Sequence, residues 1–129
     1  MYQIYTDKDV GRVEIRFDAM FDRSLIGFDE SLRLACLLTF RTVGYFDILV
    51  DYTHSKEMVG DVLQDARQRI EWCVNNGLRR SANISSDPDL RRQIEDITAA
   101  FDHILVFSNR ADAVEWLDTA TIVPLRSHP

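Results

Sequence analysis

Apolar and polar residues alternate near the start of the chain, as they do in a strand with one buried face. Val13, Ile15 and Phe17 share one face of residues 12–18, and charged side chains occupy the other face. This period of two predicts a half-buried β-strand. A shorter apolar segment at residues 2–5, followed by a polar turn, predicts that the two strands form a β-hairpin.

Further along the chain, apolar residues recur every three or four positions, which is the period of an amphipathic helix. The segments with this period are 29–42, 59–74 and 88–101, and a fourth, short helix is expected through Trp116 and Leu117. We expect Ser55 or Thr53 to cap the second of these helices, Asp87 to cap the third and Asn109 the fourth, because their side-chain oxygens accept from helix N–H groups.

Three further segments predict strands between these helices. Residues 46–52 have the centre Ile48-Leu49-Val50, which is apolar on both faces and is typical of a central strand covered on both sides. Residues 78–84 alternate weakly, and residues 103–107 predict a second buried strand.

The predicted element order is β-β-α-β-α-β-α-β-α. It favours an α/β fold with a mixed, mostly parallel sheet of about five strands, built from successive right-handed β-α units. No linker or repeat divides the chain, so residues 1–129 are expected to form a single domain. Residues 120–129 are expected to be a loose tail or an added edge strand.

The amino-acid composition and net charge argue against some classes of binding partner. The 129 residues include 15 basic and 21 acidic side chains, for a net charge of −6. That balance argues against nucleic acid and against anionic membranes as partners. The longest apolar run, 34–38, is too short to span a bilayer, and the chain does not start with a signal-peptide pattern. A cytoplasmic protein is expected, with a homodimer left open.

One group of residues has side chains that could carry catalytic chemistry. The isolated glycines form no dinucleotide or phosphate-binding motif, so no cofactor is expected. Asp51 and His54 follow the apolar strand 46–52, and in open parallel sheets ligand and catalytic groups gather at the carboxyl ends of strands. Their spacing with Glu57 matches no metal-ligand pattern, so no metal is expected. An enzyme using Asp51 and His54 remains one hypothesis.

Several segments of the sequence resemble those of the STAS-like family, which has the fold of bacterial anti-sigma-factor antagonists. The resemblance is to its stand-alone bacterial members of unknown role in particular. These segments are the strand at 46–51 with a hydroxyl-bearing turn after it, Asn76-Gly77 before a strand at 78–84, and residues 103–107 followed by 109–117. The resemblance covers nearly the whole chain in order. It implies a non-catalytic regulatory module that binds a protein partner.

The resemblance also implies a site. In regulatory members of the family, an anti-sigma factor phosphorylates a serine or threonine at the start of the helix after the third strand, and phosphorylation ends binding. By position this role falls on Thr53 or Ser55, with Asp51 and His54 on the same partner-binding surface. The partner implied is an anti-sigma factor or kinase-like protein. The turn here lacks the glycine of the family's Asp-Ser-Ser/Thr-Gly pattern.

A second hypothesis is a domain that binds a small ligand. Related folds hold lipids or nucleotides between sheet and helices, and Trp72, Phe101 and Trp116 are the candidate pocket residues. The same aromatic residues also fit ordinary core packing. The two cysteines, Cys36 and Cys73, lie on apolar helical faces and are expected to be core residues.

Overall fold

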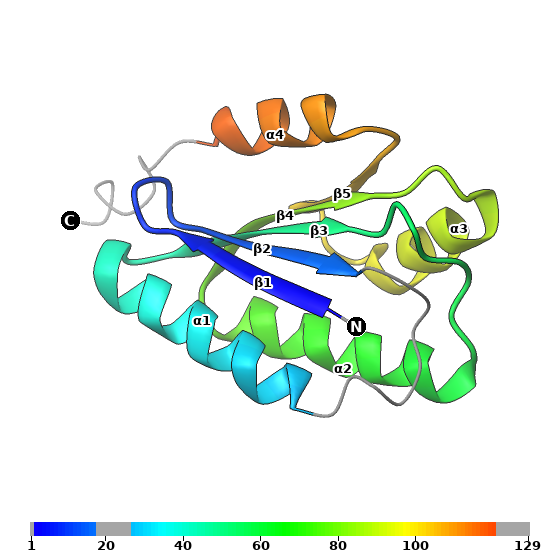
Figure 1. Cartoon of the computed structure of the whole chain (residues 1–129), viewed down its shortest axis with the longest axis horizontal. Helices are drawn as coiled ribbons and strands as arrows, with labels where there is room; N and C mark the ends of the chain where they lie inside the picture. Colours follow the sequence, from blue (N-terminus) through cyan, green and yellow to red (C-terminus); the bar gives the residue numbers. More distant parts are fainter. Residues whose placement is uncertain (1, 18–26, 121–129) are drawn as a thin grey trace.

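The computed structural model describes residues 2–17 and 27–120. The elements in these ranges are β1 (Tyr2–Asp7), β2 (Arg12–Phe17), α1 (Phe28–Val43), β3 (Phe46–Asp51), α2 (Gly60–Asn75), β4 (Leu78–Ile84), α3 (Pro88–Thr98), β5 (Ile104–Phe107) and α4 (Arg110–Asp118). The strands form one sheet in the order β1-β2-β3-β4-β5 (Figure 1). Only β1 is antiparallel to its neighbour, and the other pairs are parallel. The prediction of an α/β fold with a mostly parallel five-stranded sheet is confirmed.

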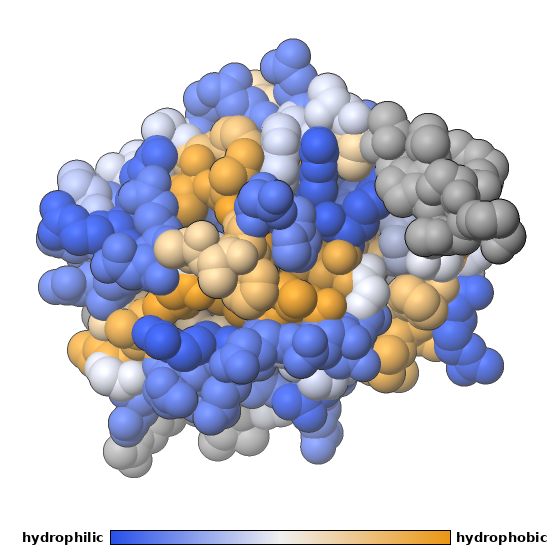
Figure 2. Space-filling view, turned by 180° about the vertical axis from the view of Figure 1, so that it is seen from behind, coloured by the Kyte–Doolittle hydropathy of each residue, from blue (hydrophilic) through white to orange (hydrophobic). Residues whose placement is uncertain are grey.

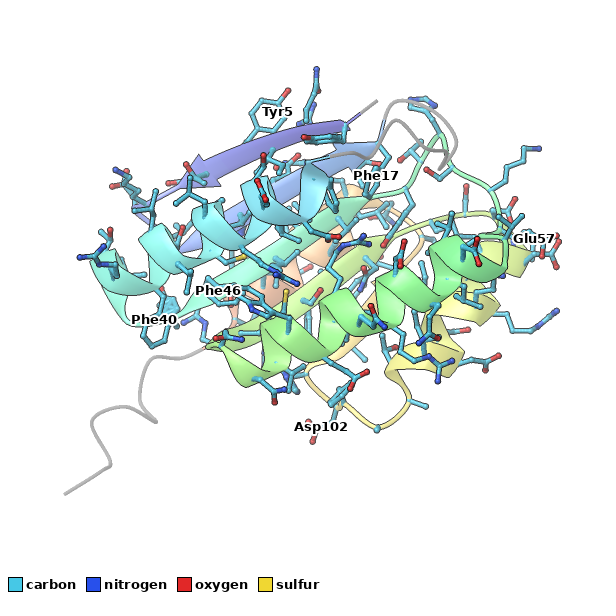
Figure 3. The ribbon with its side chains drawn as sticks, turned by 90° about the horizontal axis from the view of Figure 1, so that it is seen from below. Tyr5, Phe17, Phe40, Phe46, Glu57 and Asp102 are labelled. Atoms are coloured by element: carbon cyan, nitrogen blue, oxygen red, sulfur yellow. The ribbon has the colours of Figure 1, made fainter. Side chains whose placement is uncertain are left out.

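The sheet is covered unequally on its two faces. α1 and α2 lie side by side on one face, and α4 lies on the opposite face (Figures 1 and 3). α3 packs against α2 and β5 on the same face as α1, because Leu90 and Ile94 join Ala66 of α2 in one buried cluster with Val106 at its margin. The helix-rich face therefore holds most of the apolar core.

β3 occupies the centre of the sheet, and this position explains why residues 48–50 are all apolar. Ile48 and Val50 pack with α1 on one face, while Leu49 packs with Ala113 and Leu117 of α4 on the other. The first five residues of β3 are buried. A strand covered on both faces needs apolar side chains on both, as predicted.

β5 differs from its prediction as a buried strand. Among the described residues it pairs only with β4 and lies at the edge of the sheet, so its side chains are covered less completely. Ile104 is buried, but the side chain of Leu105 is 41% exposed. His103 precedes the strand, is half-buried, and packs its ring edge-on against Phe101 with the ring centres 5.9 Å apart. The tail or edge strand predicted for residues 120–129 lies outside the described residues beyond Ala120.

Candidate functional site

The turn after β3 carries the residues that the sequence singles out. Asp51 ends the strand, and its carboxylate Oδ1 accepts a hydrogen bond from the backbone N–H of Thr53 at 2.9 Å. The same oxygen accepts a bond from the Thr53 hydroxyl at 2.5 Å. Thr53 is exposed, so its hydroxyl lies at the surface in a fixed position beside a carboxylate.

The backbone of this turn is closed by two further hydrogen bonds. The N–H of Tyr52 donates to the carbonyl of Ile84 at the end of β4, and the N–H of Ser55 donates to the carbonyl of Tyr52, each at 2.9 Å. The first bond continues the pairing of β3 with β4, and the second makes the chain reverse at Thr53 and His54. Thr53 and His54 thus form the exposed tip of the turn.

The expectation that Ser55 or Thr53 caps the following helix is wrong. α2 begins at Gly60, its N-cap residue is Val59, and no side chain caps it. Residues 55–59 have no regular secondary structure, so the hydroxyls of Thr53 and Ser55 both lie before the first turn of the helix. The periodic apolar pattern places this helix correctly, but no cap signal in the sequence marks its start.

Ser55 and Thr53 also differ in accessibility. Ser55 is 4% exposed, and its buried hydroxyl has no hydrogen-bond partner within residues 2–17 and 27–120. A buried hydroxyl cannot enter the active site of another protein without local unfolding. Of the two hydroxyls, Thr53 is therefore the accessible one.

The second half of the segment is fixed to α3. The side-chain amide of Gln93 accepts a bond from the N–H of Met58 at 2.6 Å and donates one to the Met58 carbonyl at 2.8 Å. The Met58 side chain is buried with Leu90 and Ile94. Lys56, Glu57 and Val59 remain exposed, and Glu57 lies at the outer end of the molecule (Figure 3). The residues 51–59, which we call the β3–α2 segment, thus combine a fixed backbone with an exposed outer surface.

Charged residues of β2 and α4 lie near the same edge of the sheet. Arg16 is the register partner of Asp51 across β2 and β3. Glu14 accepts bonds from both terminal nitrogens of Arg110 at 2.8 and 2.7 Å, and from Nε of Arg16 at 2.7 Å. The bonds from Arg110 lower the pKa of Glu14 in spite of its partial burial. The charge of Asp51 also helps to raise the pKa of Arg110, after the hydrogen bonding and charge of Glu14.

Sequence reasoning missed this charge network and a second arginine link. Arg91 donates to the hydroxyl of Ser108 at 2.6 Å and to the carbonyl of Ser85 at 3.4 Å, which joins the loops after β4 and β5. The charged face of β2 is visible in the sequence as an alternation. Which arginine of a distant helix pairs with it is not visible, because that depends on the path of the chain across the sheet.

Asp51 and His54 do not form the pair that the enzyme hypothesis requires. Among the described residues, the carboxylate of Asp51 is bonded to Thr53 and makes no hydrogen bond or ion pair with His54. Neither residue lines the apolar cavity described next. No group of three His, Cys, Asp or Glu side chains in the described ranges is arranged to hold a metal ion.

A small apolar cavity lies between the sheet and the helices α1, α2 and α3. Its volume is about 50 Å³, and its walls are mostly aliphatic and aromatic, including Phe17, Phe28, Ile48, Val50, Ile70 and Ile97. Ser81, Asn83 and Arg69 supply polar groups to the wall, and Tyr52 also lines the cavity. Burial raises the pKa of Tyr52 to about 12, so its phenol stays neutral. Figure 2, seen from behind the view of Figure 1, shows apolar surface in a hollow between polar borders.

The three aromatic residues predicted for a ligand pocket are not brought together. Trp72 is half-buried on α2, where Arg33 lies over its ring at 5.5 Å. Trp116 packs on the opposite face of the sheet, 5.5 Å from Phe107 between ring centres. Phe101 contacts His103 after α3. None of the three lines the apolar cavity.

No model of a known protein family matches the chain, and a search of curated proteins likewise finds no match. Within residues 2–17 and 27–120, no helix is both long and apolar enough to cross a membrane.

Proposed function

We propose that the protein is a non-catalytic, STAS-like interaction module that binds a protein partner through the β3–α2 segment. The observation that carries the proposal is the exposed hydroxyl of Thr53, held beside the carboxylate of Asp51 on a backbone fixed at both ends. A fixed backbone with exposed side chains costs little conformational entropy on binding. The succession of strand and helix, with the sheet ordered along the chain, supports the family resemblance on which the proposal also rests.

Phosphorylation of Thr53 is the proposed control of this binding. A kinase of the anti-sigma-factor type would transfer the terminal phosphoryl group of ATP to Thr53 Oγ1, releasing ADP and the hydroxyl proton. The ester oxygen can no longer donate to Asp51, and the phosphate adds about two negative charges next to that carboxylate. Repulsion between the two groups then displaces the tip of the turn and removes the surface that the partner recognises.

The test compares three baits in affinity capture from the native cells: the wild type, Thr53→Asp and Ser86→Asp. Ser86 is a matched control because it is an exposed hydroxyl residue in the loop after the neighbouring strand β4. We expect a partner that the wild type and Ser86→Asp retain and that Thr53→Asp loses. The proposal fails if every captured protein binds Thr53→Asp and wild type equally.

Mapping of phosphate on the protein purified from the same cells tests the control step separately. We expect phosphate on Thr53 and none on Ser55, because Ser55 is buried. Phosphate found on Ser55 would overturn the choice of Thr53. If a partner is captured but no phosphate is found on the β3–α2 segment, the proposed interaction stands and the proposed control by phosphorylation is wrong.

The apolar cavity favours a second candidate function, the binding of a small apolar ligand such as a fatty acid. Its walls are apolar, and Arg69 supplies a basic group near Asp29, to which it donates a bond at 2.6 Å. Ligand pockets usually hold about 300–1,000 Å³, so α2 or α3 would have to move outward to admit a chain. Apolar walls suit a lipid better than a nucleotide, whose phosphates need several donors.

Native mass spectrometry and thermal shifts with a fatty-acid panel test this candidate. We expect a shift for the wild type and for Arg67→Gln, an exposed arginine on α2, and a smaller shift for Arg69→Gln. No bound lipid and no shift with any chain length would exclude the candidate.

A further inference from the structure

The solvent-facing side of α1 is unusually apolar. The side chains of Leu34, Leu37 and Leu38 are 59%, 42% and 48% exposed. The opposite side of the helix is buried through Phe28, Leu32, Cys36 and Thr39, so the three leucines are not needed for packing on the sheet.

The neighbouring helix shows that this is a property of α1 and not of the whole face. α2 lies beside α1 on the same side of the sheet (Figure 3). Apart from Gly60, its exposed positions are all polar: Asp61, Gln64, Asp65, Arg67, Gln68, Glu71 and Asn75. A helix with water as its permanent neighbour follows that pattern, and α1 does not.

The charges that flank the leucines on α1 are arranged symmetrically. Glu30 and Arg41 lie on the same side of the helix as Leu34 and Leu37, since steps of four, three and four residues separate the four positions. Positions 30 and 41 are equally far from the midpoint between residues 35 and 36, and so are positions 34 and 37.

Glu30 and Arg41 are also available for a partner. Neither forms an ion pair with another residue of the described ranges. Other charged residues of α1 are already engaged: Asp29 is paired with Arg69 at 2.6 Å, and Arg33 lies over the ring of Trp72.

We propose that the exposed face of α1 is the interface of a homodimer in which two copies of the helix pack antiparallel about a two-fold axis. A rotation about an axis through the midpoint of the helix places Leu34 opposite Leu37 of the second copy. The same rotation places Glu30 of each copy opposite Arg41 of the other copy, which gives two pairs of opposite charge. Heptad-like spacing of this kind suits helices that cross at about 20°.

A second copy fits this face better than a membrane does. Helices that lie on anionic membranes carry mainly basic residues beside their apolar face. Here one acidic and one basic residue flank the leucines, in a chain of net charge −6. An isologous interface must be complementary to itself, and charges of opposite sign at equal distances from the axis meet that requirement.

The first experiment measures the oligomeric state by sedimentation equilibrium. A single helix face buries less than a standard interface, so we expect a wild-type dimer that dissociates in the micromolar range. Leu37→Asp is expected to weaken the dimer at least ~10-fold, because it places a carboxylate in the centre of the interface. The matched control Gln64→Asp on α2 is expected to leave the dimer unchanged.

A wild-type chain that stays monomeric at the highest attainable concentration would overturn the proposal. So would a Leu37→Asp variant that dimerises as tightly as the wild type. Circular dichroism of the same samples shows whether each variant is folded.

Charge reversal at the exposed residues Glu30 and Arg41 tests the antiparallel geometry, and circular dichroism again shows whether each variant is folded. Glu30→Arg alone and Arg41→Glu alone are each expected to weaken self-association, because like charges then meet twice across the axis. An equimolar mixture of the two variants is expected to form a mixed dimer, in which every facing pair again has opposite charges. The double variant Glu30→Arg with Arg41→Glu is expected to dimerise like the wild type. Failure of both the mixture and the double variant to recover dimerisation would overturn the proposed pairing.

Discussion

The carboxylate of Asp47 is fully buried in β3 and is held by the guanidinium of Arg79 from β4. Nε of Arg79 donates to Oδ1 of Asp47 at 3.0 Å, and a terminal nitrogen donates to Oδ2 at 2.6 Å. The backbone N–H of Arg80 adds a bond to Oδ1 at 3.1 Å. These bonds lie where the register of β3 and β4 shifts, between Phe46 and Ile48. Burial by itself would lower the pKa of Arg79, but the bonds and charge of Asp47 raise it.

Removal of this carboxylate is expected to destabilise the fold strongly. Asp47→Ala leaves a partly buried guanidinium and a buried N–H without their partner, and loss of one member of a buried ion pair costs about 3 kcal/mol. The free energy of unfolding from urea denaturation measures the effect.

The matched control for Asp47→Ala is Asp89→Ala. Asp89 pairs with Arg92 at 3.8 Å, and the two side chains are 63% and 72% exposed. Exposed pairs contribute about 0–1 kcal/mol, so this variant should be nearly as stable as the wild type. If the two variants lost the same free energy of unfolding, burial of the Asp47–Arg79 pair would not be the reason for its large contribution.

Glu14 predicts how stability depends on pH. Its pKa is lowered from the ordinary value of 4.5, mainly by the hydrogen bonds from Arg110. The unfolded chain therefore takes up a proton at higher pH than the folded protein does. The stabilisation is complete above pH 4.5 and is lost as the pH falls from there through the folded pKa.

Arg110→Gln is the variant that tests this origin of the shift. We expect the pKa of Glu14, followed by carbon NMR of its carboxyl group, to rise toward its ordinary value. Between about pH 5 and pH 3, the range in which a glutamate carboxyl titrates, the free energy of unfolding should also fall less steeply in this variant than in the wild type. An unchanged Glu14 titration would show that Arg110 is not the cause.

The two cysteines are expected to be unreactive in the folded protein. Cys36 of α1 and Cys73 of α2 are both buried, at 0% and 3% exposure, and belong to the same core cluster. A hydrogen bond with Cys73, together with burial, raises the pKa of the Cys36 thiol and removes its thiolate form at neutral pH.

A colorimetric thiol reagent at pH 8 measures this protection. We expect the native wild type to react at a small fraction of its rate in denaturant. The exposed variant Ser86→Cys should add one rapidly reacting thiol. Rapid reaction of both native cysteines would mean that the core between α1 and α2 opens readily.

The hydrophobic pattern predicts the elements well because burial repeats along each of them. Ile48 and Leu49 face opposite sides of the sheet, and only a central strand needs apolar groups on both. Asp87 and Asn109 cap α3 and α4 as predicted, since capping depends on neighbours two or three residues away.

The sequence is less informative where distant segments meet. The residue two positions before α2, Met58, is held by Gln93 of α3, which is 35 residues away in the sequence. The exposure of Leu105 depends on whether another strand pairs beyond β5, which the composition of β5 does not decide. The same holds for the candidate site: the turn at Asp51 is visible in the sequence, whereas the burial of Ser55 and the pairing of Glu14 with Arg110 are not.

Gly77 lies between α2 and β4, where both the backbone conformation and the close approach of a neighbouring side chain require a glycine. Its φ is +114°, a conformation that side chains rarely allow, and an added Cβ would collide with the ring of Phe40 from α1. Gly77→Ala is therefore expected to lower the free energy of unfolding by about 1–3 kcal/mol. Gly60→Ala is the matched control, since an added Cβ there meets nothing within 4 Å and alanine favours the first turn of α2. Urea denaturation should place the two variants on opposite sides of the wild type or leave Gly60→Ala equal to it. If Gly77→Ala were as stable as Gly60→Ala, the close contact between the α2–β4 turn and α1 would be wrong.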